Sequence, residues 1–264
     1  MNILRGGAAM RQLSTLFNEG ATGAVTDGQL LERFATRRGE ASEDAFAALV
    51  ERHGPVVLRL CRSVVRDEHE AQDAFQATFL VVAQKAESLW VRDSLGPWIH
   101  SVAYRVASCA RAAAIRRRRH ARRHGELAAG RLAVYQDEDQ GELEALVHEE
   151  IDRLPEHFRA PLVLCDLQGC SHEQAARHLG WPVGTVKSRQ ARGRQRLRDR
   201  LIRRGLAPSP AMALGAALTP EMAVPPALMK STANLATICA GADSARVAVL
   251  AREVLTIMFL QSLK

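Results

Sequence analysis

The chain has 264 residues, with 36 Lys and Arg against 29 Asp and Glu and a formal net charge of +7. Apolar residues make up 47% and charged residues 25%, a globular composition that excludes a wholly disordered chain. Only 5% of the residues are aromatic, which argues against a large β-sandwich or barrel, and the Arg-rich surplus favours a polyanionic partner.

Cysteine usage and hydropathy favour a cytoplasmic location. The five cysteines are scattered and include no CxxC pair, so they predict no disulfide framework. The longest strongly apolar run, residues 254–260, is much shorter than the roughly 20 residues that cross a bilayer. The Cys and His residues between positions 157 and 178 lack zinc-finger spacing, so we predict no metal site and no cofactor.

Helical periodicity predicts a first helical unit. Apolar residues at three- and four-residue spacing indicate a helix over residues 46–64, interrupted at Gly54-Pro55, and a second helix over residues 68–85. A third helix begins near Trp98 and enters a run of seven arginines and no acid at residues 111–123. Phe75 and Phe79 lie four residues apart, a spacing that also fits plain core packing.

Charge is segregated along the chain. Residues 137–152 hold eight acids and neither Lys nor Arg, whereas residues 187–204 hold nine cations and one acid. The order of basic, acidic and basic blocks predicts two nucleic-acid-facing modules joined by an acidic connector.

A second helical unit follows the connector. Helices are predicted over residues 143–154 and 158–167, and Ser171 is placed to cap a short helix over residues 172–179. The breaker segment 180–184 then precedes a basic helix from Thr185 to about Arg204, which is typical of a helix-turn-helix. Gly193 lies inside that helix, where we expect a cost of about 1 kcal/mol relative to Ala.

The basic helix carries the residues best suited to reading DNA. Thr185, Ser188, Arg189 and Arg192 share one face, from which short hydroxyls and arginines reach base edges. Nearby cations are suited to phosphates: Lys187, Arg194, Arg196 and Arg198. A solvated basic surface helix is the alternative interpretation of the charge alone.

Three segments resemble the extracytoplasmic-function sigma factors of the sigma-70 family. SHEQAARHLGWPVGTVKSRQARGRQRLR resembles their carboxy-terminal DNA-binding domain, QDAFQATFLVVAQKA their polymerase-binding helix, and GPWIHSVAYRVASCARAAAIRRRRH their promoter-melting helix. The resemblance covers roughly residues 27–204. Tyr104-Arg105 stands where many members have Arg-Asn.

The resemblance implies a role for several residues. Asp73, Gln76 and Phe79 match positions that bind the RNA polymerase core, and residues 86–94 match the loop that captures a flipped base. The following match positions near the melted minus-ten element: Trp98, Arg105, Arg111, Arg116, Arg117, Arg118 and Arg119. The following match the reader of the minus-thirty-five element: Ser171, Thr185, Lys187, Ser188, Arg189 and Arg192.

The expected fold is all-α. It comprises an amino-terminal tail (1–26), a region 2 bundle (27–122), a flexible acidic linker (123–144), a region 4 helix-turn-helix (145–204) and a partly disordered extension (205–264). The last part of the extension, from residue 245, carries an apolar stripe that predicts an amphipathic helix with a regulatory contact. Its candidate partners are the chain's own domains, an anti-sigma protein and a membrane surface.

The expected function is to bind bacterial RNA polymerase core, direct it to promoter DNA and help to open the duplex. An anti-sigma factor or a membrane-linked regulator is a further expected partner, and the free chain is expected to be monomeric. The alternative is a polymerase-independent helix-turn-helix regulator, which usually binds palindromic sites as a dimer. Catalysis by the chain is disfavoured because it shows no nucleophile elbow, phosphate loop or HExxH motif. A recombinase would need a catalytic Ser or Tyr with convergent arginines, and the only tyrosines are Tyr104, which lies in a patterned helix, and Tyr135.

Overall fold

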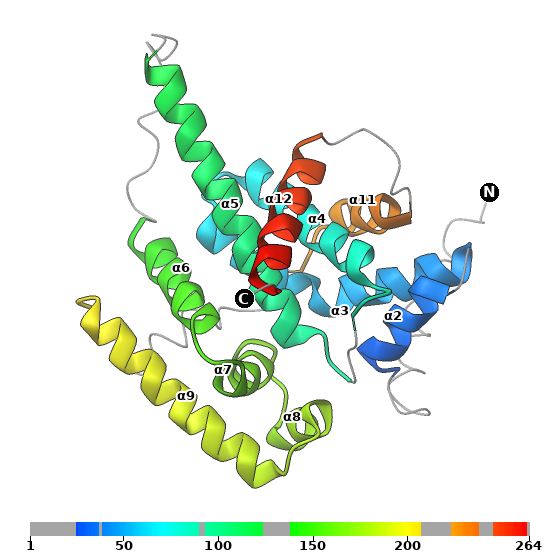
Figure 1. Ribbon diagram of the computed structural model, residues 1–264, viewed down its shortest axis with the longest axis vertical. Coiled ribbons are helices and arrows are strands. Elements are labelled where there is room, and N and C mark those ends of the chain that lie inside the picture. The colour runs from blue at the N-terminus through cyan, green and yellow to red at the C-terminus, as the bar shows by residue number, and fades with distance from the viewer. Residues whose placement is uncertain are drawn as a thin grey trace, which may run out of the picture.

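The computed structural model describes residues 25–36, 39–89, 93–123, 138–206, 223–237 and 245–262. Every regular element within these ranges is a helix (Figure 1). The predicted amino-terminal tail lies almost wholly outside the described residues, as do residues 124–137 of the predicted linker. None of the described helices is long and apolar enough to cross a membrane.

The first unit is a bundle of four helices: α2 (Asp27–Thr36), α3 (Glu40–Val64), α4 (Glu68–Lys85) and α5 (Gly96–Arg123). Its core is built around three aromatic rings. Phe46, Phe75 and Phe79 are all fully buried, and the Phe75 and Phe79 ring centroids are 5.0 Å apart. The i, i+4 spacing of Phe75 and Phe79 therefore marks the core face of α4.

Helix α3 runs without a break through Gly54-Pro55, so the predicted interruption there is wrong. Pro55 lacks a backbone N–H and removes one hydrogen bond, but packing on both sides holds the helix together. Gly54 serves close packing instead of a turn. A Cβ at this position would lie 3.1 Å from Val224 Cγ2, so the Val224 side chain would have to shift to make room for it.

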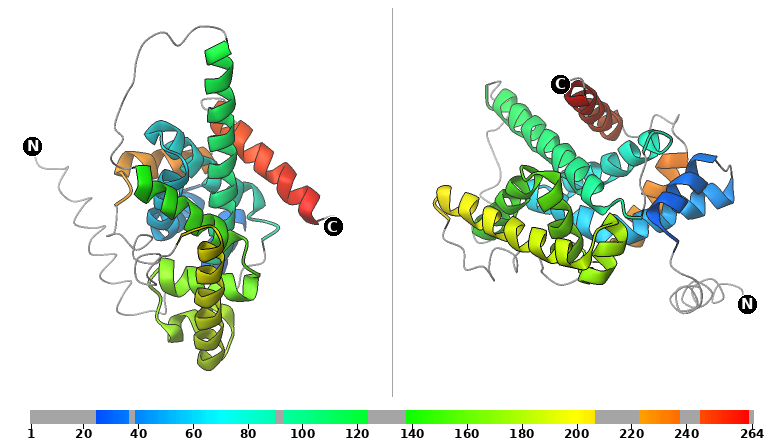
Figure 2. Two further views of the ribbon diagram at one scale, coloured as in Figure 1. Left: turned by 90° about the vertical axis from the view of Figure 1, so that its left-hand side faces the viewer. Right: turned by 60° about the horizontal axis from the view of Figure 1, so that its bottom comes forward.

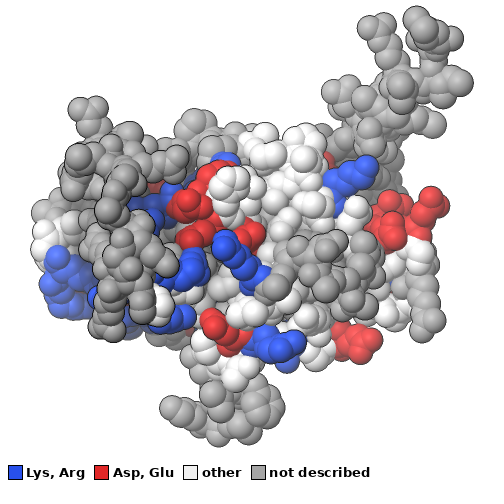
Figure 3. Space-filling model, turned by 90° about the horizontal axis from the view of Figure 1, so that it is seen from above, with Lys and Arg blue, Asp and Glu red and all other residues white. Residues whose placement is uncertain are grey.

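Helix α5 carries the arginine run away from the bundle. Its carboxy-terminal turns project beyond the neighbouring helices in Figures 1 and 2. Arg111 and the residues 116–119 are exposed. Seen from above, basic side chains crowd one end of the molecule beside acidic ones (Figure 3).

Helix α6 (Glu138–Asp152) begins inside the predicted flexible linker, so residues 138–144 are helical. The helix packs on α3 and α5 of the first unit and on α9 of the second. Ala145 belongs to the core of the first unit, whereas Val147 and Ile151 belong to that of the second. Helix α6 is therefore a shared element that joins the two units.

The second unit comprises α7 (Glu156–Leu162), a π-helical turn η1 (Val163–Leu167), α8 (His172–Leu179) and α9 (Val183–Arg203). The predicted helix over residues 158–167 is thus two elements, with a change of winding at residue 163. Gly169 follows with a φ of 70°, which glycine adopts without strain.

Two helices of the extension pack on the first unit. Helix α11 (Pro226–Thr237) contacts α3 and α4, and α12 (Ala245–Ser262) contacts α4 and α5. They lie on the opposite side of the bundle from α8 and α9 (Figures 1 and 2). Helix α12 is predicted by its apolar stripe, whereas α11 falls in the part of the extension for which no helix is predicted. Pro226 instead occupies the first residue of the helix, where the missing N–H costs nothing.

Candidate nucleic-acid interface

Helices α8 and α9 form a helix-turn-helix in which local hydrogen bonds cap both ends of α8. Ser171 accepts a hydrogen bond from the Gln174 backbone N–H at 3.2 Å, and the Gln174 side chain accepts one from the Ser171 N–H at 2.7 Å, which completes a capping box. Gly180 ends α8 with a φ of 64°. Ser171 therefore has a structural role as a helix cap, in addition to the DNA contact predicted for it.

The inner face of α9 packs on α7 and on the rest of the second unit. Its buried residues recur at three- and four-residue spacing: Val186, Gln190, Gly193, Leu197 and Leu201. A Cβ on Gly193 would lie 3.0 Å from Leu162 Cδ1 and 3.1 Å from the Phe158 carbonyl oxygen. Gly193 therefore allows close packing of α9 on α7, a gain that the expected helix penalty of about 1 kcal/mol does not include.

The outer face of α9 is open to solvent at its first turns. Lys187, Ser188 and Arg192 are exposed, whereas Thr185 and Arg189 are half-buried. The Arg189 guanidinium lies over the Trp181 ring, 4.1 Å from its centroid, and this contact orients the side chain. The four residues predicted to share this face lie together with Lys187 at one end of the helix.

A buried polar network anchors α9, and the sequence pattern does not reveal it. Asp166 of η1 is 5% exposed and accepts a hydrogen bond from Gln190 Nε2 at 2.9 Å. Arg194 forms an ion pair with the same carboxylate, and His172 Nε2 lies 2.7 Å from Gln190 Oε1. Arg194, predicted as a phosphate contact, is therefore already paired within the protein.

The α5 residues predicted to lie near the minus-ten element divide into two groups. Trp98 and Arg105 are half-buried near the bundle, and the Trp98 side chain packs against the core. Arg117 reaches α4 and pairs with Glu70. The other predicted arginines are exposed: Arg111, Arg116, Arg118 and Arg119.

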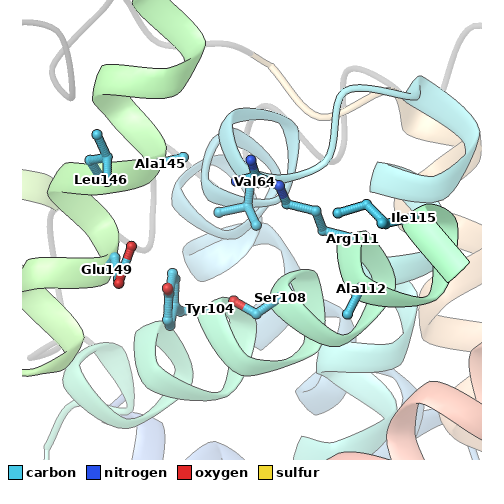
Figure 4. Close-up of a pocket in the computed structure, with 9 residues that line it drawn as sticks. All are labelled: Val64, Tyr104, Ser108, Arg111, Ala112, Ile115, Ala145, Leu146 and Glu149. Carbon is cyan, nitrogen blue, oxygen red and sulfur yellow. The ribbon is translucent and has the colours of Figure 1, made fainter.

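A hollow of about 360 Å³ lies between α5 and α6 (Figure 4). Tyr104, Ser108 and Arg111 line it from α5, and Glu149 lines it from α6. Burial raises the pKa of Tyr104, which keeps the phenol neutral. Because Arg111 stands at this junction of the two units, its charge faces both the acidic helix and solvent.

The three predicted polymerase-binding residues of α4 do not share one environment. Asp73 and Gln76 are half-buried, whereas Phe79 is fully buried against Phe46 and Phe75. Phe79 therefore supports α4 from within and presents nothing to a partner in this conformation. The resemblance implied one role for all three residues, but Phe79 lies on the inward face of α4.

Near the predicted base-capture loop, Asp27 organises a buried cluster that sequence reasoning missed. Its carboxylate accepts hydrogen bonds from His53 Nε2 at 2.7 Å and from the Leu95 backbone N–H at 2.6 Å, and it pairs with Arg52. Burial opposes its charge, but the His53 hydrogen bond and the other partners lower the pKa of Asp27 to about 2. The cluster ties the amino end of α2 to the segment before α5.

Among the described residues, no group of three or more His, Cys, Asp or Glu is arranged to hold a metal ion.

Two family models match the chain. The model described as Sigma-70 region 2 matches residues 49–124, and Sigma-70, region 4 matches residues 144–197. These ranges coincide with the α3–α5 bundle and with the α6–α9 unit.

Three curated relatives align with the same part of the chain. The "RNA polymerase sigma-H factor" of Pseudomonas aeruginosa is 32% identical over 178 residues, which cover 64% of this chain and 90% of the relative. The "ECF RNA polymerase sigma factor SigM" of Mycobacterium tuberculosis is 34% identical over 58% of this chain and 75% of the relative. "ECF RNA polymerase sigma factor SigE" of Mycolicibacterium smegmatis is 31% identical over 62% of this chain, which spans 64% of that relative's length.

Proposed function

The chain belongs to the extracytoplasmic-function sigma factors of the sigma-70 family, and from this membership we propose that it binds RNA polymerase core and directs it to promoters. The first unit engages the core and the melted minus-ten element, and α9 reads the minus-thirty-five element. The polymerase performs the chemistry, so the chain itself is no enzyme. It works in the cytoplasm, together with the polymerase.

The open outer face of α9 carries this proposal. Hydroxyl, lysine and arginine side chains lie together on its first turns, while the opposite face is buried against α7. Such a face offers hydrogen-bond donors to base edges in the major groove and cations to phosphates. The turn between α8 and α9 is closed by backbone hydrogen bonds from the Gly180 and Trp181 N–H groups to carbonyl oxygens of α8.

A run-off transcription assay tests the function directly. Purified chain, bacterial core polymerase and a library of genomic promoter fragments should yield transcripts from a defined subset of promoters. The alternative, a polymerase-independent regulator, predicts a footprint on palindromic DNA without polymerase and no transcript from core plus chain. That result would contradict the proposal.

Core binding is assigned to the α4 face, by which we mean Asp73 and Gln76. We expect the double variant Asp73→Ala/Gln76→Ala to retain less of the large polymerase subunit in a pull-down, with unchanged helical circular dichroism. Gln84→Ala, an exposed change at the other end of α4, is the matched control. If the double variant and this control retain equal amounts of the large polymerase subunit, Asp73 and Gln76 do not bind the core.

A further inference from the structure

Helices α11 and α12, which we call the C-terminal clasp (residues 226–237 and 245–262), lie across α4. Helix α11 contacts α3 and α4, and α12 contacts α4 and α5, so the clasp covers α4 from two directions (Figure 1). The two family models match residues 49–124 and 144–197, and the clasp lies outside both ranges.

The clasp is seated by apolar side chains that share one core with the first unit. Leu228 of α11 is 7% exposed, and Val247, Ala251 and Val254 of α12 are at most 1% exposed. Val249, on the other side of α12, is 53% exposed. Helix α12 therefore has a defined inward face, and the burial of that face favours the closed position.

Polar contacts of the clasp fall on the α4 face itself. Gln76 Nε2 donates a hydrogen bond to Ser231 Oγ of α11 at 3.0 Å. Asp73 is half-buried beneath the clasp, and burial raises its pKa while the positive charge of Arg246 on α12 opposes that rise. Both residues assigned to polymerase binding are thus engaged by the extension.

We propose that the C-terminal clasp is autoinhibitory: it occupies the α4 face and must leave before the RNA polymerase core can bind there. This inference rests on the proposed function, which assigns the α4 face to core binding. Two partners that need the same surface compete, so the apparent affinity for core is reduced by the fraction of molecules in which the clasp is closed. Loosening the clasp should therefore strengthen core binding. If the clasp only supported the fold of the first unit, loosening it should weaken core binding instead.

A pair of matched substitutions on α12 tests the proposal in the full-length chain. Val254→Asp places a charge on the buried face, and Val249→Asp places the same charge on the exposed face. Binding of each variant to purified core polymerase is measured by fluorescence anisotropy. We expect Val254→Asp to bind at least about tenfold more tightly than the unaltered chain, because the open fraction rises, and Val249→Asp to bind like the unaltered chain.

A second pair avoids disturbing the core if Val254→Asp fails to fold. Arg246→Glu replaces attraction to Asp73 by repulsion, and Arg252→Glu makes the same charge change at an exposed site elsewhere on α12. We expect Arg246→Glu to tighten core binding several-fold at low salt, with the gain shrinking as salt screens the pair. Arg252→Glu should show no such gain.

Hydrogen exchange gives a readout that needs no substitution. When core polymerase is added to the unaltered chain, amides of residues 226–237 and 245–258 should lose protection, while those of α4 should keep or gain it. Continued protection of both clasp helices in the complex would overturn the proposal.

The outcomes separate the inference from the function on which it rests. If the unaltered chain binds core but folded Val254→Asp and Arg246→Glu bind no more tightly, the clasp is a structural support and the inference is wrong, while the function stands. If adding Asp73→Ala to Val254→Asp does not weaken its tight binding to core, the α4 face is not the polymerase site. In that case, both the assignment of core binding to the α4 face and the autoinhibitory role of the clasp are wrong. If neither the unaltered chain nor any opened variant binds core, the proposed function itself is wrong.

Discussion

At the scale of single residues, the buried charge of Asp27 depends on partners from two other parts of the chain. His53 and Arg52 come from α3, and the Leu95 N–H comes from the segment before α5. Each partner favours the ionised carboxylate, which outweighs the cost of burial. The cluster is therefore a pH-dependent contribution to the stability of the first unit.

This cluster predicts an acid-dependent loss of stability. The pKa of Asp27 is lowered from 3.8 to about 2, so its contribution is fully present above pH 4 and is lost as the pH falls toward 2. That shift corresponds to about 2 kcal/mol at neutral pH. Urea unfolding of Asp27→Asn and of the unaltered chain should differ by about this amount at pH 7 and converge near pH 2. A constant difference across this range would contradict the assignment.

Arg189 is the residue of α9 for which we predict direct base readout. Its guanidinium is oriented over Trp181 at the exposed start of the helix. Arg189→Ala should cost about 1–3 kcal/mol at one or two promoter positions and relax the preference there. Arg203→Ala, an exposed change at the far end of α9, should weaken binding evenly across sequences. Binding titrations on single-base promoter variants measure both effects, and equal losses on every sequence would exclude base contact by Arg189.

At the scale of elements, α9 carries two glycines in opposite environments. A Cβ on Gly193 would lie 3.0 Å from Leu162 Cδ1, whereas a Cβ on Gly184 would meet nothing within 4 Å. The same substitution should therefore have opposite effects at the two positions, because helix propensity acts at both but overpacking acts only at Gly193.

We expect Gly193→Ala to lower the free energy of unfolding by about 1–3 kcal/mol, since the α7–α9 contact must widen. Gly184→Ala should raise it by up to about 1 kcal/mol. Urea denaturation of both variants measures these changes. Stabilisation by Gly193→Ala would show that α7 moves aside without cost.

At the scale of the whole molecule, a buried histidine pair lies where the two units meet. His100 Nε2 of α5 is 3.1 Å from His148 Nδ1 of α6, and both side chains are at most 2% exposed. Burial lowers the pKa of His100 well below its usual value, assisted by His148 and by the charge of Arg159. Burial and the charge of Arg59 lower the pKa of His148 to about 4.

The pair predicts that acid weakens the contact between the units. Because the folded-state pKa of His148 lies below the unfolded value of 6.5, its contribution is present above about pH 6.5 and is lost as the pH falls toward 4. The chain should be about 2 kcal/mol less stable at pH 5 than at pH 8 through His148 alone. Urea unfolding at the two pH values should show this difference shrink in His148→Gln and persist in His69→Gln, an exposed control. An unchanged pH dependence in His148→Gln would place the effect elsewhere.

Local sequence patterns determined the helical class, the helix-turn-helix and the family. Helix periodicity, a capping serine and turn glycines act over a few residues, so α4, α8, α9 and α12 were predictable within a few positions. Likewise, the outer face of α9 followed from the helical spacing of its hydroxyl and arginine residues.

Only the tertiary structure decided which face meets which distant segment. Spacing groups Asp73, Gln76 and Phe79 on one helix, yet Phe79 points into the core and Gln76 meets Ser231, which lies 155 residues away. Gly54, Gly193 and Pro226 suggested breaks or penalties, but two of them serve close packing and the third starts a helix. Helical periodicity shows which apolar face of a helix will be buried. It does not show which element covers that face, because this depends on shape and charge complementarity between elements that are remote in the chain.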